Sequence, residues 1–196
     1  RSQAVSRMME GRYERVVWWR YVSSSTLASL SEEKRSRNET LTFLFSDIRG
    51  FTSFTERSEA RDVVDTLNKI LSDQTDIIVA HDGDIDKYVG DEIVAVFSGD
   101  EAVLSAARAA LEIQSLIETE TNNRYNDLHV GIGINTGSVV VGEIGSSKRA
   151  DFTAVGDNVN VAARLCSGAA GGEILLSDTS TQIIAPMGAR LEGPYR

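Results

Sequence analysis

The 196-residue sequence has one cysteine, two prolines and no long apolar run. Cys166 cannot form a disulfide within the chain, and its half-apolar surroundings predict a packing residue rather than a reactive thiol. The scarcity of proline leaves most of the chain free to form helices and strands. No stretch reaches the roughly 18 apolar residues that a membrane-spanning helix needs, and no signal-peptide pattern is present.

Charge is unevenly distributed along the chain. Residues 1–40 hold eight Lys or Arg and five Asp or Glu, whereas the other 156 residues hold twelve and 24. An acidic body without a basic stripe argues against nucleic acid as a partner. A small anionic ligand remains compatible with this charge, because metal ions and helix N-termini can hold it. Apolar residues at 41% and charged residues at 25% are ordinary for a globular domain.

Residues 1–38 are predicted to form a helical segment, because apolar residues such as Val5 and Met9 recur at three- and four-residue spacing. One interpretation is a helical appendage on the domain. The other is a signalling helix that pairs with a second copy, and the adjacent Trp18 and Trp19 favour a contact surface. The chain begins with Arg rather than Met, so we expect a piece of a longer protein, with room for an upstream sensor or membrane anchor.

Residues 39–196 are predicted to form one α+β domain. The patterns predict strands at 40–45, 84–88, 93–97, 128–135, 138–144 and 173–177, and helices at 53–80, 101–117, 159–167 and 179–184. The strands 128–135 and 138–144 are expected to form a hairpin that turns at Asn135-Thr136-Gly137. The order βαββαβ suits a ferredoxin-like sheet with helices on one face. That topology places the third strand antiparallel beside the first.

Two aspartates are expected to meet at this sheet. Asp47 lies where the first strand stops, and Asp91 lies in the turn before the third strand. Two adjacent carboxylates repel each other unless a counter-ion is present, and a pair of divalent cations removes the repulsion. The alternative is that both are ordinary turn aspartates. After Asp47 the chain enters a helix through Gly50, and the free N–H groups of that helix start can hold phosphate oxygens.

Four segments resemble the catalytic domain of the class III adenylyl/guanylyl cyclases. They are residues 45–52 (FSDIRGFT), 86–97 (DKYVGDEIVAVF), 132–142 (IGINTGSVVVG) and 152–165 (FTAVGDNVNVAARL). All four occur in the order typical of the family, and the resemblance spans about residues 40–185. It implies the βαββαβ core of the cyclase fold and a cytoplasmic lyase domain that makes a cyclic nucleotide for signal transduction.

The resemblance assigns roles to individual residues. Asp47 and Asp91 match the metal-binding aspartates, which hold two Mg²⁺ or Mn²⁺ ions per site, with the backbone carbonyl of Ile48 as a further ligand. Asn160 and Arg164 match the pair that stabilises the transition state, and their four-residue spacing puts them on one helix face. Substrate phosphates are expected to bind at the turn formed by Ile48, Gly50, Phe51 and Thr52.

Lys87 and Thr153 match the positions that select the base. Lysine is a pure donor and suits the acceptor N1 of adenine, and a threonine hydroxyl can accept from the 6-amino group. Guanine would place its N1–H against the ammonium, so the pair favours ATP over GTP. A guanylate or relaxed-specificity cyclase is the alternative within the family. Threonine at this position marks a subgroup that often responds to bicarbonate, which makes bicarbonate a candidate activator.

The family builds each active site from two subunits, one supplying the aspartates and the other the remaining residues. This chain carries both sets, so the resemblance implies a head-to-tail homodimer with two sites. A catalytically silent nucleotide-binding module is the alternative from another class. Two departures are present: Gly131 stands where some members carry a phosphate-binding Arg, with Lys148 and Arg149 nearby in sequence, and the final hairpin with its phosphate-binding lysine is missing, as expected for a C-terminally truncated domain.

Overall fold

The computed structural model describes residues 36–145 and 150–188 of the chain. The predicted helical segment 1–38 lies outside the described residues except at its end, where Arg37 already begins the first strand. Lys148 and Arg149 also lie outside them. Within the described residues, no helix combines the length and the apolarity needed to cross a bilayer.

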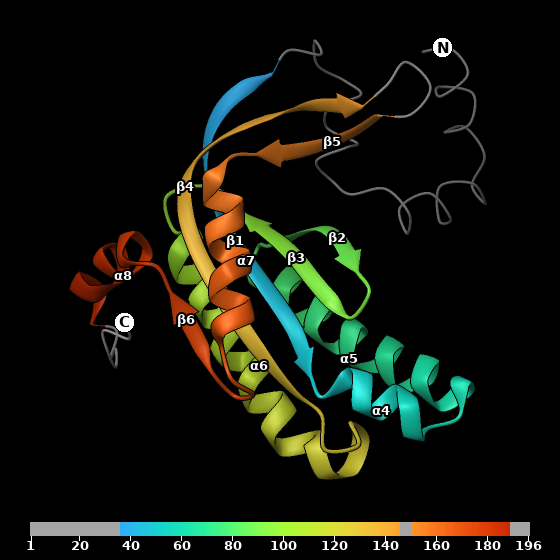
Figure 1. Ribbon diagram of the computed structural model, residues 1–196. Coiled ribbons are helices and arrows are strands. Elements are labelled where there is room, and N and C mark those ends of the chain that lie inside the picture. The colour runs from blue at the N-terminus through green and yellow to red at the C-terminus, as the bar shows by residue number, and fades with distance from the viewer. Residues whose placement is uncertain (1–35, 146–149, 189–196) are drawn as a thin grey trace, which may run out of the picture.

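A six-stranded sheet forms the centre of the fold (Figure 1). Its strands follow the order β2-β3-β1-β4-β5, and β6 pairs with β4. The strands are β1 (Arg37–Arg49), β2 (Asp84–Val89), β3 (Glu92–Phe97), β4 (His129–Gly145), β5 (Ala150–Val155) and β6 (Ile174–Leu176). The helices are α4 (Phe51–Arg57), α5 (Ala60–Ala80), α6 (Ala102–Arg124), α7 (Asp157–Gly168), α8 (Asp178–Ile184) and the 3₁₀ turn η1 (Ala185–Met187). The chain from β1 to β4 confirms the predicted βαββαβ order.

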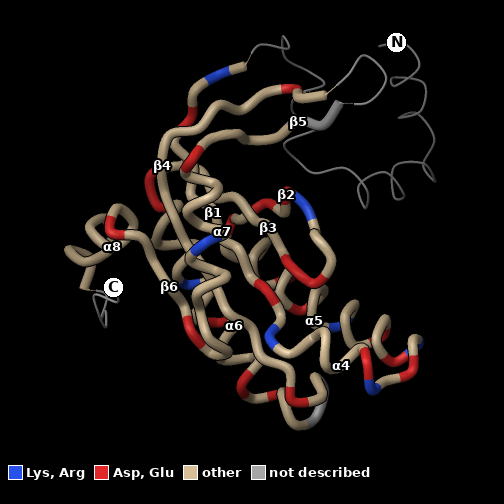
Figure 2. Tube along the Cα trace, in the orientation of Figure 1, with Lys and Arg blue, Asp and Glu red and all other residues tan. Residues whose placement is uncertain are grey.

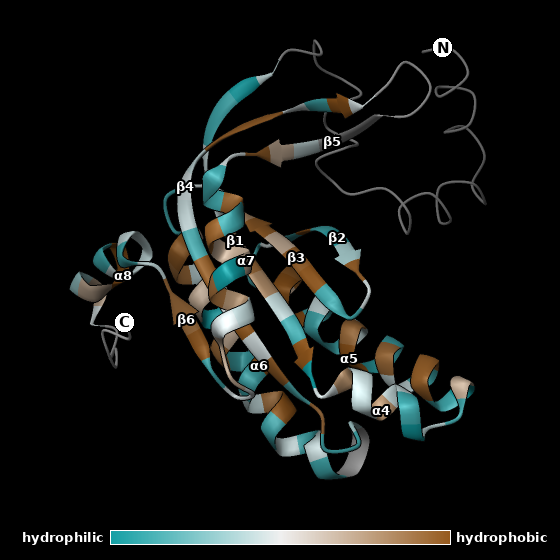
Figure 3. Ribbon diagram, viewed as in Figure 1, coloured by the Kyte–Doolittle hydropathy of each residue, from teal (hydrophilic) through white to brown (hydrophobic). Residues whose placement is uncertain are grey.

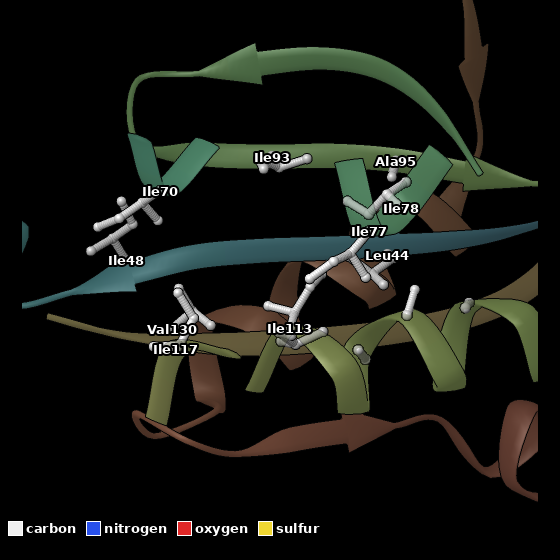
Figure 4. Close-up of a cluster of buried hydrophobic side chains, with 14 of the residues drawn as sticks. Leu44, Ile48, Ile70, Ile77, Ile78, Ile93, Ala95, Ile113, Ile117 and Val130 are labelled. Atoms are coloured by element: carbon white, nitrogen blue, oxygen red, sulfur yellow. The ribbon is translucent and has the colours of Figure 1, made fainter. Parts of the chain in front are cut away.

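The alternating side chains of β1 divide the core into two layers. Leu44 and Ile48 point toward α5 and α6 and join the larger cluster, whose isoleucines interdigitate between sheet and helices (Figure 4). Phe43 and Phe45 point to the opposite face and pack with Cys166 of α7. The helices of the βαββαβ core therefore cover one face, as predicted, and α7 covers the other. Figure 3 shows the resulting apolar strands, β3 and β6 most clearly.

The predicted hairpin at residues 135–137 is wrong, because β4 runs without a turn from His129 to Gly145. The polar residues that suggested a turn instead make buried contacts across the sheet and to α7. Asn135 Nδ2 donates to the backbone oxygen of Asn158 at 2.7 Å, and Thr136 Oγ1 lies 2.9 Å from Thr42 Oγ1. Gly137 leaves room for Asn158, whose side-chain Cγ would lie 2.2 Å from a Cβ at that position.

Two further elements differ from the sequence prediction. The helix expected over 53–80 is divided into α4 and α5 by Ser58 and Glu59, which are extended. The strand β5 was not predicted, and it pairs antiparallel with β4 along the Val140–Gly145 segment. In the strand order β2-β3-β1-β4-β5, β2 and β5 are at opposite ends. A hydrogen bond between Lys87 of β2 and Thr153 of β5 nevertheless joins them, because the sheet curves strongly (Figure 1).

The helix α7 lies unusually close to β4. A Cβ on Gly133 would meet the backbone nitrogen of Cys166 at 2.1 Å and the backbone oxygen of Ala162 at 2.5 Å. Only glycine permits this approach between a strand and a helix backbone. The position of α7 relative to the sheet is therefore fixed by backbone packing as well as by its apolar side chains.

Candidate active site

Asp47 lies at the end of a buried strand. Residues 41–46 of β1 are buried on both faces of the sheet, and Asp47 is the first residue after them that is partly exposed. It pairs across the sheet with Glu92 of β3 on one side and with Gly131 of β4 on the other. Asp91 immediately precedes Glu92, in a turn where Gly90 has a φ of 65°. The predicted juxtaposition of Asp47 and Asp91 is therefore confirmed.

The acidic residues of this corner interact electrostatically. Burial raises the pKa of the Asp91 carboxyl, and the nearby charge of Asp47 raises it further, against a backbone hydrogen bond and Arg49, which lower it. Burial also raises the pKa of Glu92, and the charges of Asp47 and Asp91 act in the same direction. Figure 2 shows the acidic positions of the β2–β3 hairpin near the end of β1. Carboxylates that repel one another favour a nearby positive charge, part of which Arg49 supplies to Asp47.

These side chains fit the ligand chemistry of a divalent cation that is shared with a substrate. In the part of the chain that the structure describes, no three His, Cys, Asp or Glu side chains gather into a complete metal cage. Mg²⁺, however, is commonly held by one or two carboxylates together with substrate phosphates. Asp47 and Asp91 offer two hard oxygen donors of this kind, at a corner where burial and then the charge of Asp47 raise the pKa of Asp91.

The turn after Asp47 leads into α4 as predicted. Gly50 adopts a left-handed conformation with φ 79°, and no side chain caps the N-terminus of α4. Phe51 and Thr52 form the first turn, while the side chain of Ile48 is buried in the core at 4% exposure. Ile48 could thus contribute only its backbone to a ligand, which agrees with the role that the resemblance gives to its carbonyl.

Lys87 and Thr153 meet although 66 residues separate them. Lys87 Nζ of β2 donates to Thr153 Oγ1 of β5 at 3.2 Å, and it also forms an ion pair with Asp86 at 3.0 Å. The side chain of Lys87 is exposed to 47%. A donor and an acceptor thus stand next to each other on the surface, where the strong curvature of the sheet brings β2 and β5 together.

Asn160 and Arg164 are both exposed on α7. Arg164 Nε lies 3.3 Å from the backbone oxygen of Asn160, so the arginine folds back along its own helix. In the described chain, neither residue makes a hydrogen bond or an ion pair with Asp47 or Asp91. The structure therefore brings together the two aspartates, and separately Lys87 with Thr153, but it does not join either group to Asn160 and Arg164.

Three residues near the site were not singled out from the sequence. Arg49 forms an ion pair with Asp47, Glu92 extends the acidic corner, and Asn158 ties the start of α7 to β4. The alternation of β1 could have indicated Arg49, because a residue two positions after Asp47 lies on the same face of the strand. Arg49 also accounts for Gly131: a Cβ there would lie 2.5 Å from Arg49 Nη2.

Comparison with known proteins identifies the family. Residues 33–193 match the sequence family described as the adenylate and guanylate cyclase catalytic domain. The chain belongs to this class III cyclase family. It is 37% identical over 131 residues to the terminal-differentiation-specific adenylate cyclase of Dictyostelium discoideum, a match that covers 64% of this chain and 6% of that protein. The cyclase domain thus spans only a small part of that much longer relative.

Solved cyclase structures have the same fold. The adenylyl cyclase CyaB from P. aeruginosa superposes with a TM-score of 0.73 at 32% identity, covering 78% of this chain and 83% of that one. The guanylyl cyclase Cya2 superposes with a TM-score of 0.69 at 37% identity, covering 76% and 79%. The α+β cyclase fold is therefore established. Because both adenylyl and guanylyl cyclases match, the base preference must be argued from the site.

Cys166 of the cyclase domain is predicted to be unreactive. Its side chain is fully buried between α7 and the sheet, and burial raises its pKa to about 12. At pH 8 only about one thiol in 10⁴ is then ionised, against roughly a quarter for an ordinary cysteine. We expect an aromatic disulfide reagent to modify the native protein at least about 100-fold more slowly than the urea-unfolded protein, followed by absorbance. Equal rates would contradict the burial of this thiol.

Proposed function

We propose that this cyclase domain is an adenylate cyclase, which converts ATP to 3′,5′-cyclic AMP and pyrophosphate. The observation that carries the proposal is the hydrogen bond of 3.2 Å between Lys87 Nζ and Thr153 Oγ1. N1 and the 6-amino group are neighbours on one edge of adenine, the first an acceptor and the second a donor. An ammonium and a hydroxyl held side by side offer the complementary pattern, since the threonine oxygen keeps a lone pair for the amino group.

Guanine fits the same two groups poorly. Its N1–H would face the ammonium of Lys87, so two donors would meet, although the hydroxyl of Thr153 can still donate to O6. A site built to hydrogen-bond one pattern discriminates strongly against the other, because mismatched polar groups are left unpaired. The relatives that make cyclic AMP support this preference, although guanylyl cyclases share the fold.

In this reaction the protein acts mainly by positioning the substrate and by stabilising the charge of the transition state. The ribose 3′-oxygen attacks the α-phosphorus, the bond to the bridging oxygen breaks, and pyrophosphate leaves. In this proposal Asn160 orients the ribose, and Arg164 stabilises the charge that grows on the phosphate oxygens, for which a guanidinium is well suited. Asp47 and Asp91 would hold two Mg²⁺ or Mn²⁺ ions, which supply positive charge to the hydroxyl and the triphosphate when bound.

The proposed enzyme is a head-to-tail homodimer. Asn160 and Arg164 are exposed and make no bond to the acidic corner of their own chain. A second copy that supplies them to Asp47 and Asp91 would complete two equivalent sites, as closed twofold symmetry requires. The turn at Gly50 to Thr52 would bind substrate phosphates in each site. Activation by bicarbonate and control by an upstream domain stay predictions from the family resemblance.

Replacing Lys87 by glutamate tests the base assignment. Lys87→Glu puts an acceptor opposite N1, which should favour guanine N1–H and disfavour adenine. We expect the ratio of kcat/KM for ATP to that for GTP to fall by at least about 100-fold. Steady-state rates with each nucleotide, with products resolved by chromatography, measure the ratio.

Lys69→Glu is the matched control, because it makes the same charge change at an exposed position on α5. The control should keep the parental ratio. An unchanged ratio in Lys87→Glu, with measurable activity, would refute the donor–acceptor argument. A parent that prefers GTP would instead favour the guanylate cyclase alternative, and ATP binding without product would favour a silent module.

A further inference from the structure

Arg49 connects the acidic corner to the helix α7. It lies at the end of β1, two residues after Asp47 and on the same face, and its Nη1 forms an ion pair with Asp47 Oδ2. Its Nε donates to the backbone oxygen of Ala169 at 2.9 Å, and its Nη2 donates to the backbone oxygen of Cys166. Three nitrogens of one guanidinium therefore bond to three acceptors. Two of these acceptors, Cys166 and Ala169, lie more than 100 residues after Arg49 in the sequence.

The acceptors on α7 suit a cation. Cys166 and Ala169 lie at the C-terminal end of the helix, where the carbonyl of Cys166 accepts only the close N–H of Ala169, at 3.0 Å, and keeps a lone pair for Arg49. The negative end of the helix dipole also lies there, and it favours a positive side chain. The side chain of Arg49 keeps only 25% of its surface exposed, so these bonds are partly shielded from water. The guanidinium thus bonds to Asp47 of β1 on one side and to the C-terminal end of α7 on the other.

Gly131 provides the space for this arrangement. It faces Asp47 across the β1–β4 ladder. A Cβ at residue 131 would lie 2.5 Å from Arg49 Nη2, 2.7 Å from Arg49 Nε and 2.7 Å from the oxygen of Ala169. Any larger residue would have to displace the guanidinium and one of the carbonyls to which it bonds. The contacts of Arg49 therefore require a residue without a side chain at position 131.

We propose that Arg49 is a positioning residue, which fixes the carboxylate of Asp47 for a divalent cation by fastening it to the C-terminal end of α7. The proposal rests on the proposed function, in which Asp47 is a metal ligand. Arg49 bonds to Oδ2 of the carboxylate and leaves Oδ1 for the cation. Groups that hydrogen-bond to a ligating carboxylate orient it, and their loss commonly weakens metal binding about 10- to 100-fold.

Binding of Mn²⁺ alone tests the proposal without turnover. The electron paramagnetic resonance signal of free Mn²⁺, titrated with the full chain, gives the affinity in the absence of nucleotide. We expect Arg49→Ala to weaken binding by about 10-fold. Arg49→Lys should not restore it, because a single ammonium cannot span three acceptors as a planar guanidinium does. Arg108→Ala removes one exposed cation from α6 and should keep the parental affinity.

Gly131→Ala disturbs the same contacts without changing any charge. It should weaken Mn²⁺ binding to a similar extent as Arg49→Ala, so it serves if the arginine variant fails to fold. Gly168→Ala is its matched control near the same helix end. A Cβ there meets only Leu175 Cδ1, at an ordinary 3.8 Å, so parental affinity is expected.

Asp47→Ala separates this proposal from the proposed function. If Asp47→Ala weakens Mn²⁺ binding while Arg49→Ala and Gly131→Ala leave it unchanged, the positioning role is overturned and the metal site stands. Full recovery in Arg49→Lys would also overturn it, since charge alone would then suffice. If neither Asp47→Ala nor Arg49→Ala affects the affinity, the metal site itself is wrong and both proposals fall.

Discussion

Two inactive variants of the domain are expected to restore each other. Asp47→Ala removes a proposed metal ligand and Arg164→Ala removes the proposed transition-state cation, and each should lower kcat by at least about 100-fold. In a mixture at equal concentration, about half of the dimers contain one chain of each kind. In such a dimer one site receives both lesions and the other receives none. The mixture should therefore regain about a quarter of the parental activity.

A second mixture is the matched control for this result. Asp47→Ala and Asp91→Ala damage the same half of the site, so every site of their mixed dimer lacks one aspartate. We expect no recovery from this pair. Initial rates of cyclic AMP formation, measured after incubation at a concentration that permits exchange of subunits, compare the two mixtures. Recovery in both mixtures, or in neither, would contradict sites built from the acidic corner of one chain and α7 of another.

Replacing Asp91 by asparagine should abolish activity and yet stabilise the metal-free domain. The variant keeps the shape of the side chain but removes a carboxylate whose pKa is raised by burial and by the charge of Asp47. In the absence of metal, that ionised carboxylate works against folding. Because the group remains partly exposed and screened, the gain should be small, on the order of 1–3 °C in Tm.

The stabilisation by Asp91→Asn should depend on pH in a defined direction. A carboxyl whose pKa is raised by folding opposes the folded state when it is ionised, above that pKa, and no longer does so once it is protonated. The advantage of Asp91→Asn should therefore be largest at neutral pH and should shrink as the pH falls through the raised pKa of Asp91. Thermal unfolding in EDTA, followed by circular dichroism, tests it. A variant less stable than the parent at pH 7, or an advantage that grows in acid, would contradict the electrostatic account.

The order of strands and helices could be predicted from the sequence because strand-forming residue types and helical periodicity mark the elements locally. The β-branched and aromatic run of β1, together with the apolar periodicity of α5 and α6, predicted the βαββαβ core, and its topology placed Asp47 beside Asp91. Local patterns carry this information directly, since each face must be buried against the next layer. The motif residues needed more than periodicity, because their roles were implied by resemblance to the cyclase family.

The errors arose where polar residues make tertiary contacts. Asn135 and Thr136 suggest a turn when only their neighbours in sequence are considered, but Asn158 and Thr42 satisfy them inside the fold. Residues of this kind form hydrogen bonds equally well in a turn or across a sheet, so their type alone does not decide. Whether Asn135 lies in a turn or bonds across the fold becomes clear only from the position of α7, which carries its acceptor Asn158.

The contacts of Arg49 could not be predicted from the sequence for a related reason. In the sequence it is one charged residue next to a glycine turn, and its three acceptors are Asp47, Cys166 and Ala169. Two of these acceptors are backbone oxygens, which any residue type supplies, so no sequence pattern marks them. Gly131 is similarly uninformative until the space that it leaves is seen to contain the guanidinium.

Product formation by the full chain is the direct test of adenylate cyclase activity. ATP and GTP, each with Mg²⁺ or Mn²⁺, would be incubated over a range of protein concentrations, with Asp47→Ala as the control. We expect cyclic AMP from ATP in preference to cyclic GMP from GTP, at a rate that rises more than linearly with protein concentration and is lost in the control. Preferential formation of cyclic GMP, or activity that Asp47→Ala retains, would contradict this expectation.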